Sequence, residues 1–129
     1  MIKLTQVKKT YTDHVQIGPL ELEIPKAGLT ALIGPNGAGK STTLMMIGRL
    51  LQLDEGQIQV AGLDVSSTKS KDLAKIMTIL RQENHFVTRL TVRQLVGFGR
   101  FPYSQGRMTL EDENITSKYI DFLDLTPLE

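Results

Sequence analysis

Residues Gly34 to Ser41 read GPNGAGKS and match the pattern GxxxxGK[ST], whose residue types suit the binding of a phosphate chain. The glycines allow the backbone to curve so that several N–H groups point at one anion. Lys40 would place an ammonium group against the β- and γ-phosphates, and the Ser41 hydroxyl is a hard oxygen ligand that suits Mg²⁺. The candidate nucleotide-binding residues, with the threonine that follows the pattern, are Gly34, Pro35, Asn36, Gly37, Ala38, Gly39, Lys40, Ser41 and Thr42.

Such a loop needs a strand before it and a helix after it, and the flanking residues have both patterns. Residues 29–33, LTALI, are a short apolar run that suits a buried parallel strand. Residues 41–51 have a helical composition, and Leu44, Ile47 and Leu51 would share one apolar face. The positive end of this helix would point its unpaired N–H groups at the same anion.

Alternation of apolar and polar residues predicts further strands at 2–7, 20–24 and 57–60. Pro25 ends the second of these strands, because proline cannot donate a hydrogen bond to a sheet. Residues 76–80, IMTIL, are a second candidate for a buried strand. The N-terminal part of the chain is therefore predicted to be rich in strands.

The C-terminal part is predicted to be mostly helical. Residues 91–98 form a short helical pattern, whereas residues 100–107 contain a proline and a glycine and are predicted to be a loop. Thr109 can cap a last helix, with Asp112 at the capping-box position. The apolar face of that helix would consist of Ile115, Tyr119, Phe122 and Leu123.

The composition of the 129 residues excludes several classes of protein. Hydrophobic residues make up 40% and charged residues 22%, so a core can form and disorder is not the main state. The net charge of +1 argues against a broad nucleic-acid-binding surface, and the absence of cysteine excludes disulfides and thiol catalysis. No apolar run approaches the roughly 20 residues that span a bilayer, and no signal peptide precedes the first strand. We therefore expect a soluble, intracellular chain.

Charge is distributed unevenly along the chain. Residues 69–107 contain eight basic and two acidic residues, a net charge of +6, whereas residues 108–129 contain six acidic residues and one lysine, a net charge of −5. The basic segment is either an ordinary solvated face or a surface that docks on a partner.

The longer string from Gly34 to Thr43, GPNGAGKSTT, resembles the Walker A motif of ABC-type ATPases, and the NKxD motif of GTPases is absent. The resemblance implies an α/β fold of the P-loop NTPase type with an N-terminal antiparallel β subdomain, an incomplete parallel sheet and the start of a helical subdomain. It implies ATP and Mg²⁺ as ligands, with Lys40 catalytic. The nucleotide-binding core would span residues 1–86 and the truncated helical subdomain residues 87–129.

Two further residues match positions of this family. Tyr11 lies where the family has an aromatic residue that stacks on adenine; without the family, it would be a surface or core-edge tyrosine. Gln82 follows the predicted strand at 76–80, where the family has its Q-loop glutamine. The resemblance implies that Gln82 is catalytic, reaches Mg²⁺ and the attacking water, and links the site to the membrane subunit.

Residues 83–107 look most like the ATPase subunits of iron–siderophore importers, chiefly in the tract VGFGRFPY at 96–103. The ATPases of haem and cobalamin importers share much of this pattern. The resemblance implies transmembrane permease subunits and a second ATPase subunit as partners, with a substrate-binding protein acting indirectly and no nucleic acid. It also implies a peripheral location on the cytoplasmic face of the cell membrane.

Several motifs of the family are absent: the LSGGQ signature, the Walker B strand with its catalytic glutamate, the D-loop and the switch histidine. Residues 50–55, LLQLDE, resemble the end of a Walker B strand, but they lie at the end of the predicted helix and are followed by a turn at Gly56, which leaves no room for a separate strand. We expect an open sheet edge, exposed apolar area and an unstable or self-associating fragment that binds ATP weakly and hydrolyses little. The alternatives are a soluble ABC ATPase of repair or translation, and a truncated, non-hydrolysing module that binds the permease or the full-length subunit.

Overall fold

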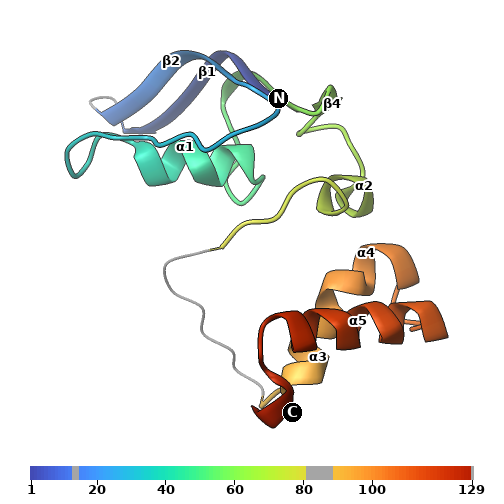
Figure 1. Cartoon of the computed structure of the whole chain (residues 1–129). Coiled ribbons are helices and arrows are strands. Elements are labelled where there is room, and N and C mark those ends of the chain that lie inside the picture. Colours follow the sequence, from blue (N-terminus) through green and yellow to red (C-terminus); the bar gives the residue numbers. More distant parts are fainter. Residues whose placement is uncertain (13–14, 81–88, 129) are drawn as a thin grey trace. The chain divides into compact units, whose positions relative to one another are not determined.

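The computed structural model describes residues 1–12, 15–80 and 89–128. These residues form two compact units, Met1–Ile79 and Leu80–Glu129, each of which is described by itself. The predicted boundary between residues 86 and 87 lies outside the described residues. The first unit contains β1 (Ile2–Thr12), β2 (Val15–Ile24), α1 (Lys40–Ile47), β3 (Glu55–Val60), β4 (Leu63–Asp64) and α2 (Ser70–Ala74) (Figure 1). The second contains α3 (Val92–Gly97), α4 (Phe101–Ser104), α5 (Leu110–Phe122) and the 3-10 turns η1 (Phe98–Arg100) and η2 (Thr126–Leu128).

The first unit is built on a four-stranded antiparallel sheet with the strand order β2-β1-β3-β4. Leu4 of β1 pairs with Leu22 of β2 on one side and with Ile58 of β3 on the other. The three strands predicted from alternation are confirmed as β1, β2 and β3, although all three are longer than predicted. β2 ends at Ile24, directly before the proline that was predicted to end it.

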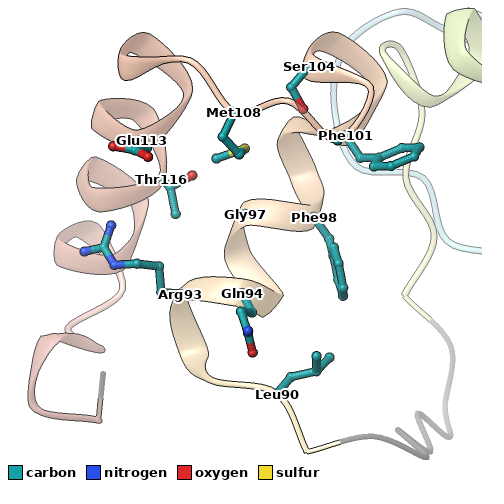
Figure 2. Close-up of a pocket in the computed structure, with 11 residues that line it drawn as sticks. Leu90, Arg93, Gln94, Gly97, Phe98, Phe101, Ser104, Met108, Glu113 and Thr116 are labelled. Atoms are coloured by element: carbon teal, nitrogen blue, oxygen red, sulfur yellow. The ribbon is translucent and has the colours of Figure 1, made fainter.

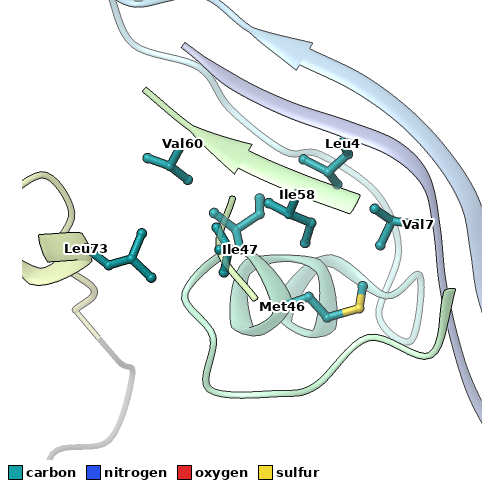
Figure 3. Close-up of a cluster of buried hydrophobic side chains, with 8 residues drawn as sticks. Leu4, Val7, Met46, Ile47, Ile58, Val60 and Leu73 are labelled. Atoms are coloured by element: carbon teal, nitrogen blue, oxygen red, sulfur yellow. The ribbon is translucent and has the colours of Figure 1, made fainter. Parts of the chain in front are cut away.

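The core of this unit lies between the sheet and α1, and Figure 3 shows Met46 and Ile47 directed at the buried strand residues. The members of the core are Leu4, Val7, Met46, Ile47, Ile58, Val60, Val65 and Leu73. The helix is shorter than predicted, and it buries Thr43 beside Met46 and Ile47. Leu44 is 53% exposed, so the predicted apolar face was wrong at that position. The side of the helix that packs against the sheet is the side that becomes buried.

The two predicted buried strands are not present. Residues 29–33 and 76–80 have no strand conformation, and Leu29, Ile33 and Leu80 are 100%, 89% and 89% exposed. A parallel strand forms only against a hydrogen-bonded neighbour, whereas every strand pair among the described residues is antiparallel. The expected exposed apolar area is observed at these side chains.

The second unit contains two helices whose predicted starts are confirmed. Thr91 and Thr109 each form a capping box at the N-terminus of a helix, α3 and α5 respectively. The prediction of a loop at 100–107 was wrong, because α4 occupies its first part with a proline in the first turn, where the missing N–H costs no hydrogen bond. No helix among the described residues is long and apolar enough to cross a membrane.

The predicted apolar face of α5 was also wrong. Tyr119, Phe122 and Leu123 are more than half exposed, whereas the buried residues of this helix are Asp112, Thr116 and Ile120. The side of a helix that becomes buried is decided by its neighbour in space. Here α3 is the helix that packs against α5, and Arg93 of α3 donates a hydrogen bond to the Ser117 hydroxyl of α5 at 3.0 Å.

Asp112 makes the stability of the second unit depend on pH. Its Oδ2 atom accepts hydrogen bonds from the Thr109 backbone N–H at 3.0 Å and hydroxyl at 2.8 Å, and its Oδ1 atom accepts one from Arg100 Nε at 2.8 Å. The bond from the Thr109 N–H, followed by those from its hydroxyl and from Arg100, holds the pKa of Asp112 below its usual value. A lowered pKa in the folded state stabilises the fold above the unfolded pKa, and this stability is lost as the pH falls through the folded pKa.

Asp112→Asn should therefore lower the unfolding temperature of the second unit at neutral pH, and the difference from the unsubstituted chain should shrink on acidification below about pH 4. Circular dichroism melts at a series of pH values would measure this. Glu111→Gln is the matched control, since it removes the same charge from the same first turn of α5. A difference between the Asn variant and the unsubstituted chain that stays constant through the acid range would contradict this role of the carboxylate.

Candidate functional site

The loop between β2 and α1 has the backbone conformation that its glycines were predicted to provide. Gly37 and Gly39 have φ angles of 82° and 83°, in the left-handed region that favours glycine. A Cβ atom at position 39 would also lie 2.9 Å from Cδ1 of Ile17, so a larger residue there would displace the Ile17 side chain as well as strain the backbone. Inside the loop the Ala38 N–H donates to the Pro35 carbonyl at 3.3 Å.

The first turn of α1 is open to an anion. The helix begins at Lys40, and Gly39 at its N-cap provides no side-chain cap. The first turn contains no acidic residue, so no carboxylate competes for the positive end of the helix dipole. Thr43 turns inward, and its N–H and hydroxyl donate to the Gly39 carbonyl at 2.8 and 2.9 Å. The N-terminal N–H groups before it fit the terminal oxygens of a phosphate group.

Lys40 lies folded back over the loop that precedes it. Its Nζ atom donates hydrogen bonds to the carbonyls of Gly34 at 2.8 Å and Pro35 at 2.7 Å. This places a positive charge beside the loop and the start of α1. A phosphate oxygen would offer the ammonium group a charged acceptor, which forms a stronger hydrogen bond than a neutral carbonyl.

Tyr11, although distant in the sequence, lies beside the first turn of α1. Its hydroxyl is 3.3 Å from Oγ1 of Thr42, and the residue is 51% exposed, so part of the ring is open to a ligand. Ser41 is exposed between Lys40 and Thr42. Gln82, the other predicted catalytic and Mg²⁺-binding residue, lies outside the described residues.

The described residues fit a nucleotide with Mg²⁺ better than a metal ion held by the protein alone. No group of three or more histidine or acidic residues that could hold a metal occurs in the described parts of the chain. The Ser41 hydroxyl would thus be one ligand among phosphate oxygens and water, which is the usual way that Mg²⁺ is bound with nucleotides. The glycine loop, the open first turn and Lys40 would supply the phosphate contacts.

Asp54 is a residue of this region that the sequence analysis did not identify as functional. It follows α1 in the segment that resembles a Walker B end, and its carboxylate accepts hydrogen bonds from the Thr10 N–H at 2.8 Å and Lys9 Nζ at 2.7 Å. The bond from Lys9, followed by that from Thr10, holds the pKa of Asp54 below its usual value. The feature of the sequence that could have identified Asp54 is charge complementarity. Two adjacent lysines, Lys8 and Lys9, form ion pairs with the adjacent acidic residues Glu55 and Asp54, respectively.

The second unit has a cavity of about 610 Å³ between α3, α4 and α5 (Figure 2). Leu90, Phe98, Phe101 and Met108 supply apolar side chains to it. None of the predicted site residues that the structure describes lines this cavity.

Comparisons with known proteins agree with the geometry of the loop. A family model described as ABC transporter matches residues 17–128. The petrobactin import ATP-binding protein FatE of Bacillus anthracis is 81% identical over 129 residues, which cover 100% of this chain and 52% of the relative. The petrobactin import ATP-binding protein YclP of Bacillus subtilis is 43% identical over 136 residues, which cover 95% of this chain and 54% of the relative. The chain thus spans about half the length of these curated relatives.

A solved structure is also similar. It is a dimeric, post-hydrolysis state of an ATP-binding cassette bound to ADP and Pi, with a TM-score of 0.75 and 26% sequence identity. The match covers 100% of this chain and 58% of that cassette. It confirms the predicted fold class, with an antiparallel β subdomain and helices that follow it.

Proposed function

The chain belongs to the ABC transporter family, and from this we propose that it is the nucleotide-binding part of the ATP-binding subunit of an importer for iron–siderophore complexes. The observation that carries the nucleotide-binding part of the proposal is the loop from Gly34 to Gly39, which leads into an uncapped helix with Lys40 folded over it. This arrangement suits the phosphates of Mg-ATP.

Each part of the site has a separate task in this proposal. The loop and the first turn of α1 bind the phosphates through backbone N–H groups, and Lys40 exchanges its two carbonyl partners for phosphate oxygens. Ser41 contributes a hydroxyl ligand to Mg²⁺, which neutralises phosphate charge when bound. Tyr11 stacks on adenine from the side of Thr42. Gln82 remains the proposed link between Mg²⁺, the attacking water and the membrane subunit.

We propose that the whole protein hydrolyses ATP, whereas this chain binds nucleotide and hydrolyses little. Phosphoryl transfer depends on a positioned water and on groups that stabilise the charge of the transition state. The described residues supply phosphate contacts but contain no carboxylate hydrogen-bonded within the loop. The signature motif and the Walker B strand with its catalytic glutamate, which the family uses for hydrolysis, are absent from these 129 residues.

The names of the relatives support the substrate class and the partners. Both petrobactin import proteins are ATP-binding components of import systems by name. We propose that the whole protein works as a pair of subunits on the cytoplasmic face of a membrane permease. A substrate-binding protein would deliver the iron–siderophore complex to that permease. The dimeric state of the similar cassette supports the pair. The basic segment at 69–107 would be the surface that faces the permease.

Calorimetric titration with Mg-ATP tests the nucleotide site directly. The chain should bind one Mg-ATP saturably, and adenosine, which lacks phosphates, should bind far more weakly because most of the proposed contacts are between the loop and the phosphates. Circular dichroism before the titration establishes that the chain is folded. Failure of a folded chain to bind Mg-ATP would contradict the proposed site.

Transport is tested in the full-length protein in its host. A Lys40→Ala allele should abolish growth on an iron–siderophore as the sole iron source and leave growth on free iron unchanged. Growth on haem and cobalamin under matched conditions distinguishes the three substrate classes. Co-purification of the subunit with a membrane permease would separate an importer from a soluble ATPase of repair or translation.

A further inference from the structure

Asp54 is hydrogen-bonded to three successive residues of β1. Its backbone N–H donates to the Lys8 carbonyl at 2.9 Å. Its Oδ1 atom accepts from Lys9 Nζ at 2.7 Å, and its Oδ2 atom accepts from the Thr10 N–H at 2.8 Å. Lys9 is well packed, with a side chain only 16% exposed. Together these bonds join the segment that follows α1 to the part of β1 that leads to Tyr11.

The position of Asp54 explains why β1 needs this support. The register of β1 with β3 ends at Lys8, which pairs with Glu55, whereas its register with β2 continues to Thr12. On the β3 side, the carboxylate of Asp54 therefore takes the place of a strand partner for the Thr10 N–H. Without it, the end of β1 would have its regular partner on one side alone.

Tyr11 follows Thr10 directly and depends on the same stretch of backbone. Its hydroxyl lies 3.3 Å from Oγ1 of Thr42, a long hydrogen bond that by itself holds the ring weakly. The residue is also 51% exposed, so packing restrains the ring only in part. A half-exposed ring binds a planar ligand better when its backbone is held in place beforehand, because less freedom is lost on binding.

We propose that Asp54 is a positioning residue for Tyr11 and thereby sets the preference of the site for an adenine nucleotide over a bare triphosphate. This inference rests on the proposed nucleotide-binding function. Asp54 acts through the backbone of β1 and contacts neither the loop at 34–39 nor Lys40 through any hydrogen bond described here. Its loss should therefore affect the base and spare the phosphates.

The test compares the affinities for Mg-ATP and Mg-tripolyphosphate by calorimetry in three chains. Complete loss of an aromatic stack weakens binding by about 5- to 150-fold. Loss of positioning is a part of that effect, so Asp54→Ala should weaken Mg-ATP binding about three- to tenfold and leave tripolyphosphate binding unchanged. Glu55→Ala is the matched control: it removes the same charge from the next residue, which pairs with Lys8 at 2.7 Å, and it should change neither affinity.

The emission of Tyr11 gives a second measurement that a general loss of stability would not imitate. The chain has three tyrosines and no tryptophan, so Tyr103→Phe with Tyr119→Phe leaves Tyr11 as the sole emitter. Saturating Mg-ATP should quench Tyr11 in this background, and Asp54→Ala should reduce the quenching at saturation. Asp54→Asn retains an acceptor for the Thr10 N–H, so its Tyr11 quenching should lie between that of the chain with Asp54 and that of Asp54→Ala. This variant keeps the test valid if the alanine variant fails to fold.

Each possible result either supports or contradicts the positioning role of Asp54. Selective loss of Mg-ATP affinity with reduced Tyr11 quenching supports the positioning role. An unchanged preference for Mg-ATP in the Asp54 variants, or an equal loss for both ligands, overturns it while the nucleotide site stands. A folded, unsubstituted chain that binds neither ligand overturns the proposed function itself, and the inference with it.

Discussion

Lys40→Ala is expected to weaken Mg-ATP binding at least tenfold. Its Nζ atom makes two short hydrogen bonds, to the carbonyls of Gly34 and Pro35, and is thereby held beside the phosphate-binding loop. A hydrogen bond between charged groups contributes about 1.5–3 kcal/mol, which corresponds to roughly a 10- to 150-fold change in affinity. The substitution removes this contribution and also releases the two loop carbonyls. Calorimetric titration with Mg-ATP measures the change.

Lys26→Ala is the control for this measurement. Lys26 is exposed in the segment after β2, so its loss changes the net charge by the same amount without a contact to the loop described here. The affinity of the Lys26→Ala variant for Mg-ATP should match that of the unsubstituted chain. A loss of less than about twofold for Lys40→Ala would show that the backbone N–H groups alone bind the phosphates.

Leu4→Ala should have the largest effect on stability, with a loss of about 2–5 kcal/mol in the free energy of unfolding. Leu4 is completely buried in the centre of the antiparallel sheet, between Leu22 and Ile58 of the neighbouring strands. Removing its side chain leaves a cavity where the sheet meets α1 (Figure 3). Domains of this size are stable by only about 5–15 kcal/mol, so the loss is a large fraction of the total. Urea unfolding followed by circular dichroism measures it.

Leu29→Ala is the same chemical change at the opposite extreme of burial, because Leu29 is 100% exposed in the same unit. We expect its free energy of unfolding to remain within about 0.5 kcal/mol of the unsubstituted chain. Equal losses for the two variants would mean that the packing of the first unit differs from that described. Leu4→Val, a smaller truncation, gives a measurable value if Leu4→Ala does not fold.

Features that depend on neighbours in the sequence were predicted well. The strand that ends before Pro25 and the capping box of Thr109 and Asp112 were both expected from short patterns. The conformation of the glycine loop belongs to the same class, because its glycines and the start of the following helix lie within ten residues of sequence, at 34–43. In such features the residues that make the contacts are also neighbours in the chain, so the pattern contains nearly all of the information.

Features that depend on a partner in space were decided by the tertiary structure. The apolar runs at 29–33 and 76–80 have the composition of buried strands, yet they form none because no parallel neighbour pairs with them among the described residues. The buried residues of α5 are Asp112, Thr116 and Ile120, whereas Tyr119, Phe122 and Leu123 of its apolar pattern are exposed. Hydrophobic burial has no direction of its own, so a pattern alone cannot say which face finds a partner.

The candidate site also contains both kinds of feature, those set by local sequence and those set by tertiary contacts. By itself the sequence predicted the glycine loop at 34–39 and a helix that begins with Lys40 and Ser41, since local backbone conformation and residue type suffice for these features. Only the tertiary structure brought Tyr11 to Thr42 across 31 residues of sequence and Asp54 to Thr10 across 44. These contacts depend on how strands and helix pack, and the packing is set by the shared core rather than by any single segment.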